Sequence, residues 1–413
     1  MPHRTDVLII GAGQAGLAMS CCLTAYGIDH VVLERGRVAE RWRSERWDSL
    51  RLLTPNWMTR LPGFSYDKHD FDDFMPAGAV WRLLRDYSRQ IAAPVRKGIS
   101  VTGVGACGSG FLVSTDAGHW RVRCVVVATG ACDVPAVPSW ASALDPAIHQ
   151  ILPNQYRNPG LLPRGRVLVV GASATGVQLA AEIHRSGRPV LLAAGRHARV
   201  PRKYRGRDLM AWMDVSGILE EPRHRTVGPA RPQPSLQLTG SGQDEIGLPT
   251  LASQGVKLLG RAIGGAGHSI GFDDTLGAEC NASEGRRRAL LSRIDAHIAA
   301  ARLSAPPDSA AWVPPPALRA EATQIDLRSA GIRSVVWATG YRRNYPWLHL
   351  PVFDAQGEIR NRGGETDIPG LFVLGLPFMR HRASSFIDGV GRDATSLASA
   401  IVRQLAGSTA RAA

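Results

Sequence analysis

The chain has 413 residues, of which 44% are hydrophobic and 20% charged, so it is long enough for two or three packed globular units. Its formal net charge is +14, but only 4 of the 49 basic residues are lysines, and no nucleic-acid motif or basic stretch with interleaved aromatics is present, so we expect no nucleic-acid partner. No apolar run approaches the ~20 residues of a membrane helix and no charged-then-apolar leader opens the chain, so we expect a cytoplasmic protein without a membrane partner.

The N-terminal segment predicts a βαβ unit. A buried strand is expected at 6–10, a glycine turn (GAGQAG) at 11–16, a helix at 17–26 that is closed by Gly27, and a second strand (VVLE) at 31–34. This order of elements is typical of a parallel sheet with a right-handed crossover.

The rest of the first half adds three elements before a second unit begins. An amphipathic helix is expected at 80–91, and paired strands at 111–115 and 120–130. A linker rich in Pro and Asn, residues 153–165, then leads into another strand, glycine turn, helix and strand over 167–195. The chain therefore repeats its opening unit after about 160 residues.

The second half is less regular. Residues 226–285 are rich in Gly, Pro and Ser and predict no clear element, whereas 286–303 predicts an exposed helix. A Pro-rich linker follows, and then two buried strands at 332–341 and 371–377 and a closing helix at 393–407.

The chain contains an internal echo. VVVATG at 125–130 returns almost unchanged as VVWATG at 335–340, and the two glycine turns are a second repeated pair. We therefore expect an α/β fold with two Rossmann-type dinucleotide-binding domains, the second inserted into a discontinuous first. The expected boundaries give 1–155 and 322–413 to the first domain and 160–321 to the inserted one.

The first glycine turn predicts FAD. Gly11 lets the chain turn off the strand, Gly13 lets the backbone approach a pyrophosphate, and Gly16 lets the helix pack closely. Glu34 follows Gly11 by 23 residues, where a carboxylate binds an unphosphorylated adenosine ribose. The polar segment after it and the two ATG strands favour FAD over NAD. The residues expected to bind FAD are Gly11, Gly13, Gly16, Glu34, Arg35, Trp42, Arg43, Thr129 and Gly130.

The second glycine turn predicts NADPH. Serine at its middle position still lets a dinucleotide dock, and six cations lie between residues 196 and 207. The first of them, Arg196, stands where the first unit has Glu34, and an arginine there suits a 2′-phosphate. The residues expected to bind NADPH are Gly171, Ser173, Gly176, Arg196 and Arg199. Two dinucleotides in one chain predict hydride transfer from nicotinamide to flavin.

These segments resemble a known family. GAGQAG, VVVATGACDVPAVP, VGASATG, ATGY and LFVLGLP are together similar to class B flavoprotein monooxygenases, which include the flavin-containing monooxygenases and the plant indole-pyruvate monooxygenases. The resemblance covers the chain except about 226–320. It implies that NADPH reduces FAD and that O2 then forms a C4a-peroxyflavin, which oxygenates a small organic substrate. It also implies that Asn56 lies near the flavin ring, that the segment with His381 lies over it, and that Asp388 binds FAD near the pyrimidine edge. Asn56 and His381 are the candidate catalytic residues.

One departure from the family keeps alternatives open. The family signature has a histidine four residues before an aromatic, and here Leu152 precedes Tyr156. The chain could therefore be an NADPH-dependent flavin oxidoreductase or oxidase without oxygen insertion, or a non-enzymatic flavin redox sensor. A hydroxylase with an NADH-like cofactor and no flavin is a weaker alternative. The sequence predicts no oligomeric state.

Disulfide reduction of the thioredoxin-reductase kind needs paired thiols near the flavin. None of the six cysteines forms a Cys-x-x-Cys pair or a zinc-type cluster, so we expect reduced thiols and no metal site. Cys124 and Cys132 would lie ~26 Å apart along an extended chain, which is too far for a disulfide.

Overall fold

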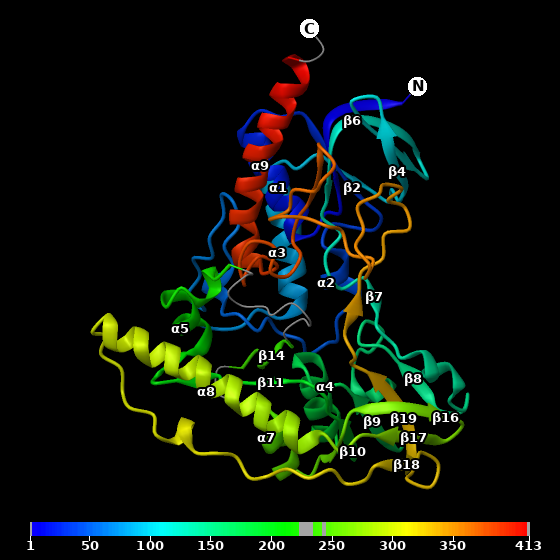
Figure 1. The fold of residues 1–413 in the computed structure, drawn as a ribbon, viewed down its shortest axis with the longest axis vertical. Helices are drawn as coiled ribbons and strands as arrows, with labels where there is room; N and C mark the ends of the chain where they lie inside the picture. The colour runs from blue at the N-terminus through cyan, green and yellow to red at the C-terminus, as the bar shows by residue number, and fades with distance from the viewer. Residues whose placement is uncertain (1, 223–233, 242–244, 411–413) are drawn as a thin grey trace.

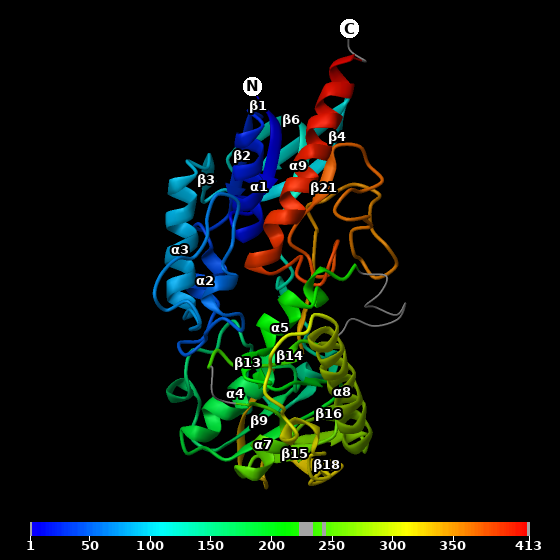
Figure 2. The ribbon, with the colours of Figure 1, turned by 90° about the vertical axis from the view of Figure 1, so that its left-hand side faces the viewer.

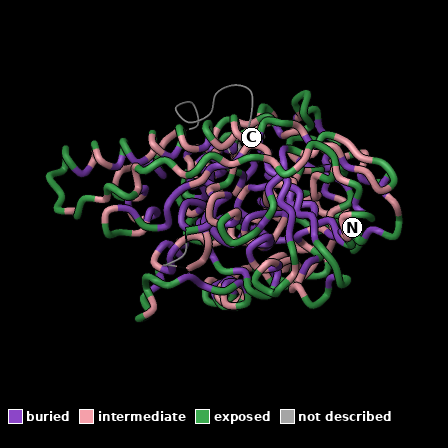
Figure 3. The backbone as a smooth tube through the Cα atoms, turned by 90° about the horizontal axis from the view of Figure 1, so that it is seen from below, coloured by how far each residue is buried: buried purple, intermediate pink, exposed green. Residues whose placement is uncertain are grey.

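The structure is a computed structural model that describes residues 2–222, 234–241 and 245–410. The chain forms two lobes stacked along its long axis, and both termini lie at the outer end of the first lobe (Figures 1 and 2). Buried residues follow the strands through the middle of the molecule, and exposed residues gather in the outer loops and helix faces (Figure 3). The predicted α/β fold with two Rossmann-type units is confirmed.

The first lobe is built on a sheet of seven strands in the order β3-β2-β1-β6-β5-β4, with β21 also paired to β6. The strands are β1 (His3–Ile10), β2 (His30–Glu34), β3 (Val95–Lys97), β4 (Val101–Cys107), β5 (Gly110–Thr115), β6 (Gly118–Val127) and β21 (Leu371–Val373). Strand β6 pairs in antiparallel fashion with β5 along its first half and in parallel with β21 along its second half. The parallel part is therefore β3-β2-β1-β6-β21, and the β4–β5 hairpin extends it.

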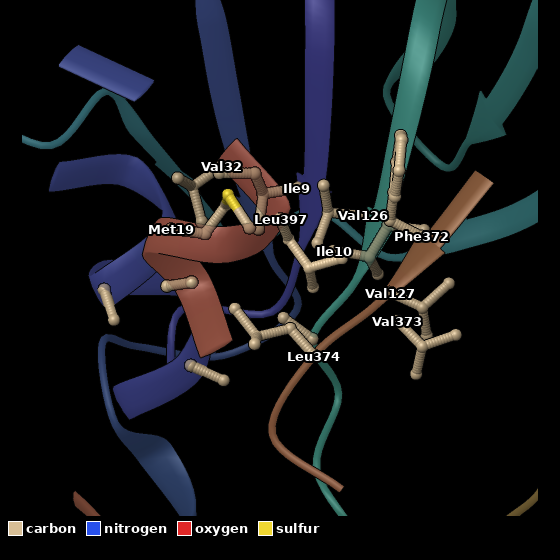
Figure 4. Close-up of a cluster of buried hydrophobic side chains, with 14 of the residues drawn as sticks. Ile9, Ile10, Met19, Val32, Val126, Val127, Phe372, Val373, Leu374 and Leu397 are labelled. Atoms are coloured by element: carbon tan, nitrogen blue, oxygen red, sulfur yellow. The ribbon is translucent and has the colours of Figure 1, made fainter. Parts of the chain in front are cut away.

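In the described part of the chain, four helices belong to this lobe. They are α1 (Gln14–Ala25), α2 (Glu40–Ser44), α3 (Ala77–Gln90) and α9 (Ile387–Ala410), and α1 packs against α9. Figure 4 shows the core between them, where Ile9, Val126 and Phe372 of three neighbouring strands meet Met19 of α1 and Leu397 of α9. Strands buried on both faces read as continuous apolar runs, which is why VLII and VVV were recognisable in the sequence.

The second lobe has an all-parallel sheet in the order β15-β10-β9-β19-β8. Its strands are β8 (His149–Ile151), β9 (Arg166–Val170), β10 (Val190–Ala193), β15 (Lys257–Leu259) and β19 (Ile332–Trp337). The lobe also contains α4 (Ala174–Arg185), α5 (Leu209–Val215), α7 (Leu248–Ser253) and α8 (Leu276–Ala300).

Short strands complete the fold. They form four small sheets: β7 (Val134–Pro135) with β20 (Tyr341–Arg342); β11 (Ala198–Arg199) with β14 (Leu236–Gln237); β12 (Lys203–Tyr204) with β13 (Arg207–Asp208); and β16 (Ala262–Ala266), β17 (Ser269–Phe272) and β18 (Gln324–Asp326). The stretch 226–285, which predicted no clear element, thus contains short strands, α7 and the start of α8 in its described part. Helix α8 begins ten residues before the predicted start at residue 286 and buries Leu291, Ile294 and Ile298.

Strand pairing bears on where one lobe ends and the other begins. Strands β8 and β19 lie in the second sheet, although the predicted boundaries at 155 and 322 assigned them to the first domain. The two chain crossings, β7 and β20, pair with each other in antiparallel fashion between the lobes. We therefore propose that the boundaries lie near residues 135 and 340.

Each lobe repeats one arrangement of three strands. The strand before the glycine turn lies between the next strand of its βαβ unit and an ATG strand, as β2-β1-β6 in the first lobe and β10-β9-β19 in the second. The sequence repeat thus corresponds to a repeat in the fold. In each lobe, the ATG strand pairs with the strand that leads into the glycine turn.

Candidate dinucleotide sites and the interface between them

The first glycine turn leaves no room for side chains at two of its three glycines. Gly11 has a φ of +107°, and a Cβ on it would lie 2.7 Å from the carbonyl oxygen of Ala128 and 3.4 Å from the Cα of Thr129. A Cβ on Gly16 would lie 1.9 Å from the carbonyl oxygen of Gly11, whereas a Cβ on Gly13 would meet no heavy atom within 4 Å. The turn is therefore open at Gly13, where a pyrophosphate is expected.

Helix α1 begins at this turn with no side chain capping its first N–H groups. Gly13 is the N-cap residue, and the first turn contains no acidic residue. At the end of β2, the carboxylate of Glu34 accepts hydrogen bonds from the backbone N–H groups of Ala12 and Gly36, both at 2.8 Å. The helix end offers N–H groups and partial positive charge to a phosphate, and the carboxylate is fixed beside it. These residues fit the pyrophosphate and the adenosine ribose of FAD.

The three other predicted FAD residues of this region differ in where their side chains lie. The indole Nε1 of Trp42 donates to the side-chain oxygen of Gln14 at 3.5 Å, which brings Trp42 to the first glycine turn. The Arg35 side chain is 65% exposed. The guanidinium of Arg43 lies over the ring of Trp81 in α3, 5.3 Å from its centroid. Of the three, Trp42 is the one that the fold places against the turn.

The second glycine turn has the same backbone geometry. Gly171 has a φ of +108°, and a Cβ on it would lie 2.2 Å from the carbonyl oxygen of Ala338. A Cβ on Gly176 would lie 1.7 Å from the carbonyl oxygen of Gly171. Ser173 is the N-cap residue of α4, and its side chain makes no capping hydrogen bond. The helix end is thus available to a second phosphate, as the sequence predicted for NADPH.

A buried amide that the sequence did not point to lies beside this turn. Gln237 of β14 is fully buried, its Nε2 donates to the carbonyl oxygen of Ala172 at 2.6 Å, and its Oε1 has no hydrogen-bond partner. The next residue, Leu238, accepts a hydrogen bond from Gln178 of α4. Strand β14 therefore covers the second turn. It belongs to the stretch without periodicity, so no sequence signal marked it.

The six cations after β10 do not act as one cluster. Three of them have carboxylate partners: Arg199 with Glu245 and Glu284, Arg202 with Asp208, and Arg205 with Asp295. Arg202 is 2% exposed and also donates to backbone oxygens, so its role is structural. The NADPH contact predicted for Arg199 competes with two glutamates. Ala193 pairs with Val170 as Leu33 pairs with Ile10, so Ala194 is the position equivalent to Glu34. Arg196 lies two residues further on, and its contact with a 2′-phosphate stays a prediction.

The closing segment between β21 and α9 connects the two lobes. The backbone N–H groups of Arg382 and Ala383 donate to carbonyl oxygens of residues 219–221 in the second lobe. In the first lobe, Gln14 of the glycine turn donates its side-chain N–H to the carbonyl oxygen of Ser385 at 2.8 Å. The segment thus contacts the first glycine turn on one side and the second lobe on the other. That it lies over the flavin ring stays a prediction.

A buried histidine of this segment faces a buried carboxylate of helix α9. His381 Nε2 lies 3.2 Å from Asp393 Oδ1, and the two residues are 8% and 0% exposed. Neither ring nitrogen of His381 and neither carboxylate oxygen of Asp393 has a hydrogen-bond partner among the described residues. Buried polar groups need a polar partner, and the imidazole of His381 is the group that faces this carboxylate, so the structure pairs Asp393 with His381. The sequence pointed to His381 and missed Asp393, because twelve residues separate them.

Asp388, predicted near the pyrimidine edge of FAD, has a partner of its own. Its buried carboxylate pairs with Arg60, whose guanidinium also lies 3.3 Å from Asp214 of α5 in the second lobe. Burial raises the pKa of Asp388, and the charge of Arg60 opposes this increase. The side chain therefore takes part in an ion-pair chain between the lobes, and its contact with FAD stays a prediction.

Asn56 lies in the short η1 helix (Asn56–Met58) and is 1% exposed. Its Nδ2 donates to the backbone oxygen of Asp70 at 2.9 Å, which is what a loop-capping residue does. Its Oδ1 is buried and has no hydrogen-bond partner. The unpaired oxygen leaves Asn56 one acceptor for a ligand group, so its predicted place near the flavin ring stays a prediction.

Comparison with known proteins independently indicates an oxidoreductase. A family model for pyridine nucleotide-disulphide oxidoreductases matches residues 8–212. A Geobacillus kaustophilus protein described as an uncharacterized oxidoreductase, CzcO-like, is 29% identical over 96% of this chain and 98% of its own length. The indole-3-pyruvate monooxygenase YUCCA1 of Oryza sativa is 27% identical over 50% of this chain and 54% of its own length.

Solved structures share the fold. A flavin-containing monooxygenase from Stenotrophomonas maltophilia superimposes with a TM-score of 0.68 at 18% identity, covering 97% of this chain and 99% of its own. A bacillithiol disulfide reductase from Staphylococcus aureus gives a TM-score of 0.61 at 12% identity, over 97% of this chain and 99% of its own. The chain is an FAD- and NADPH-dependent oxidoreductase. Its resemblance to class B flavoprotein monooxygenases is confirmed.

Among the described residues of this oxidoreductase, no helix is both long and apolar enough to span a bilayer.

Proposed function

We propose that this oxidoreductase is a monooxygenase that reduces FAD with NADPH and uses O2 to oxygenate a small organic substrate. The observation that carries the proposal is a pair of glycine turns with the same backbone geometry, one followed by an acidic residue and the other by a basic residue. The carboxylate of Glu34 lies at the first turn, and Arg196 follows β10 at the second. The first charge suits an adenosine ribose and the second a ribose with a 2′-phosphate.

The chemistry that bound FAD would supply is acceptance of a hydride from NADPH and donation of electrons to O2. The protein binds and orients both cofactors. In the first lobe, the N–H groups at the start of α1 bind the pyrophosphate, and Glu34 orients the ribose. In the second lobe, α4 does the same for NADPH, while Arg196 distinguishes it from NADH.

A buried apolar cluster joins residues of the first lobe to helix α5 of the second. Met58 and Ala383 of the first lobe are 1% and 0% exposed, and they share a buried cluster with Met210, Trp212 and Met213 of α5. Low dielectric strengthens every electrostatic contact in such a region and prevents loss of reactive species to water. A small substrate would have to enter beside this cluster.

Release of peroxide without oxygen insertion is the competing function. Leu152 stands at the position where the family signature has histidine, and the nearby Tyr156 is buried with its hydroxyl donating to Glu182 Oε1 at 3.2 Å. A leucine offers no hydrogen bond to a bound group. Relatives with the histidine would then differ from this chain in what they do with O2.

One experiment separates the two. The purified protein is reduced with NADPH without oxygen, and is then exposed to ¹⁸O2 with thioanisole as a soft sulfur probe. Bleaching of the flavin by NADPH followed by ¹⁸O in the sulfoxide would support the monooxygenase. Bleaching followed by stoichiometric hydrogen peroxide and no labelled sulfoxide would favour an oxidase, and a colourless protein that does not take up FAD would refute both.

A further inference from the structure

We propose that Arg286 of α8 is a second cation of the 2′-phosphate site and determines, together with Arg196, the preference for NADPH over NADH. The inference rests on the proposed NADPH-dependent function and deepens it. It adds a residue that lies 90 positions from Arg196 in the sequence and in a helix outside the βαβ unit.

The geometry brings the two arginines to one place. Arg196 follows the end of β10, and His197 comes next to it. The Nη2 atom of Arg286 donates to the carbonyl oxygen of His197 at 2.7 Å. Helix α8 packs along β11, which begins at the following residue. The guanidinium of Arg286 is thus anchored to the backbone beside Arg196, at the end of the strand where the ribose of a dinucleotide is expected.

The electrostatics agree with this placement. Burial lowers the pKa of Arg286, the charge of Arg196 lowers it further, and Glu279, two turns earlier on the same face of α8, raises it. The charge of Arg196 therefore acts on Arg286. Two guanidinium groups held together repel each other, and a phosphate dianion that accepts hydrogen bonds from both removes this repulsion.

The neighbouring arginines differ from Arg286 in their partners. Arg287 and Arg288 on the same helix both pair with Glu284, which also pairs with Arg199. Those three surround a carboxylate, so they are held as a structural cluster. Arg286 makes its hydrogen bond to a backbone oxygen instead, and its side chain lies on an exposed part of the helix. Its guanidinium still has N–H groups to offer a ligand, because a single backbone bond uses one of five.

The test is titration of the FAD-loaded protein with 2′,5′-ADP and with 5′-ADP, which differ only in the 2′-phosphate. We expect Arg286→Ala to weaken 2′,5′-ADP binding roughly 10-fold to 100-fold, as loss of a charge-assisted contact does, and to change 5′-ADP binding less than about 2-fold. Arg286→Lys should recover part of the loss because it keeps the charge. Arg288→Ala is the matched control on the same helix and should leave both affinities unchanged.

Two outcomes would overturn the inference in different ways. If the wild-type protein prefers 2′,5′-ADP but Arg286→Ala does not reduce that preference, Arg286 is not part of the site and the proposed function stands. If the wild-type protein binds both nucleotides equally, no 2′-phosphate site exists, and the NADPH proposal fails together with this one. Thermal unfolding of each variant shows whether it is folded, and the exposed position of Arg286 predicts an unchanged Tm.

Discussion

The two glycine turns are nearly identical in backbone and opposite in charge. Gly11 and Gly171 have φ values of +107° and +108°, and a Cβ on the last glycine of each turn would lie within 2 Å of a carbonyl oxygen. What differs is the charged residue near the end of the second strand. Glu34, the last residue of β2, accepts two backbone N–H groups in the first lobe, and Arg196 lies three residues after β10 in the second. The backbone thus specifies that a dinucleotide binds, and the charge specifies which ribose it carries.

The same comparison separates residues of structure from residues of recognition. Arg199, Arg202 and Arg205 follow Arg196 within nine residues, and each pairs with one or two carboxylates. In the first lobe, Glu34 is itself tied to the turn and still faces the expected ribose. A charged residue near a glycine turn is therefore informative only once its partners are known.

The largest expected effect comes from filling the last glycine of either turn. Gly16→Ala and Gly176→Ala would each push a Cβ to within 1.9 Å or 1.7 Å of a backbone oxygen, a clash that no rotamer relieves. We expect the free energy of unfolding to fall by about 3 kcal/mol or more in each variant. Gly16→Ala should lose FAD as well, whereas Gly176→Ala should stay yellow and lose NADPH binding. Flavin absorbance per protein measures the retention of FAD, and thermal unfolding measures the loss of stability.

Gly13→Ala is the matched control for this pair. A Cβ there meets no protein atom within 4 Å, so the variant should unfold at the same temperature as the wild type. Its affinity for FAD should nevertheless fall, because the methyl group would occupy space expected for the pyrophosphate. Full FAD retention in Gly16→Ala would show that the two turns are more pliable than their geometry indicates.

The next largest effect concerns the segment between β21 and α9, which contacts both lobes and has no counterpart in the repeat. His381→Ala would leave Asp393 as a buried carboxylate without its facing imidazole, and we expect a loss of about 3 kcal/mol in the free energy of unfolding by urea. Turnover should change while the flavin is retained. The double variant His381→Ala with Asp393→Ala should recover part of the stability, because it removes the unpaired charge; a double loss that equals the sum of the single losses would contradict the pairing.

Removing Arg196 is expected to have a smaller and more selective effect. Arg196→Ala should raise the Michaelis constant for NADPH roughly 10-fold to 100-fold, or ~1.5–3 kcal/mol, and that for NADH much less. Lys203→Ala, an exposed cation on β12, should change neither. Glu34→Gln sharpens the comparison from the other side, because it should weaken FAD binding and leave the ratio of NADPH to NADH unchanged. An equal effect of Arg196→Ala on both coenzymes would mean that Arg196 does not read the 2′-phosphate.

The smallest effect concerns Asp388. Burial raises its pKa in the folded protein above the ordinary value of 3.8, so the neutral carboxyl favours the folded state. This contribution is fully present below pH 3.8 and is lost as pH rises through the raised pKa. Asp388→Asn should remove that pH dependence from urea unfolding curves. At neutral pH it should change stability by less than about 1 kcal/mol, because Arg60 is 46% exposed and water can solvate it. A steeper pH dependence in the variant would contradict the assignment.

The sequence by itself determined the local devices of this protein. The apolar runs, the glycines at fixed spacing and the charge after each second strand predicted two βαβ units, FAD and NADPH, since each of these signals lies within about 30 residues. Tertiary structure alone decided the rest: that β19 joins the second sheet, that Arg199 is bound by two glutamates, that Asp393 faces His381, and that Arg286 reaches the backbone beside Arg196. The physical reason is that strand order and charge pairing depend on contacts between residues far apart along the chain, and such contacts have no local pattern from which to infer them.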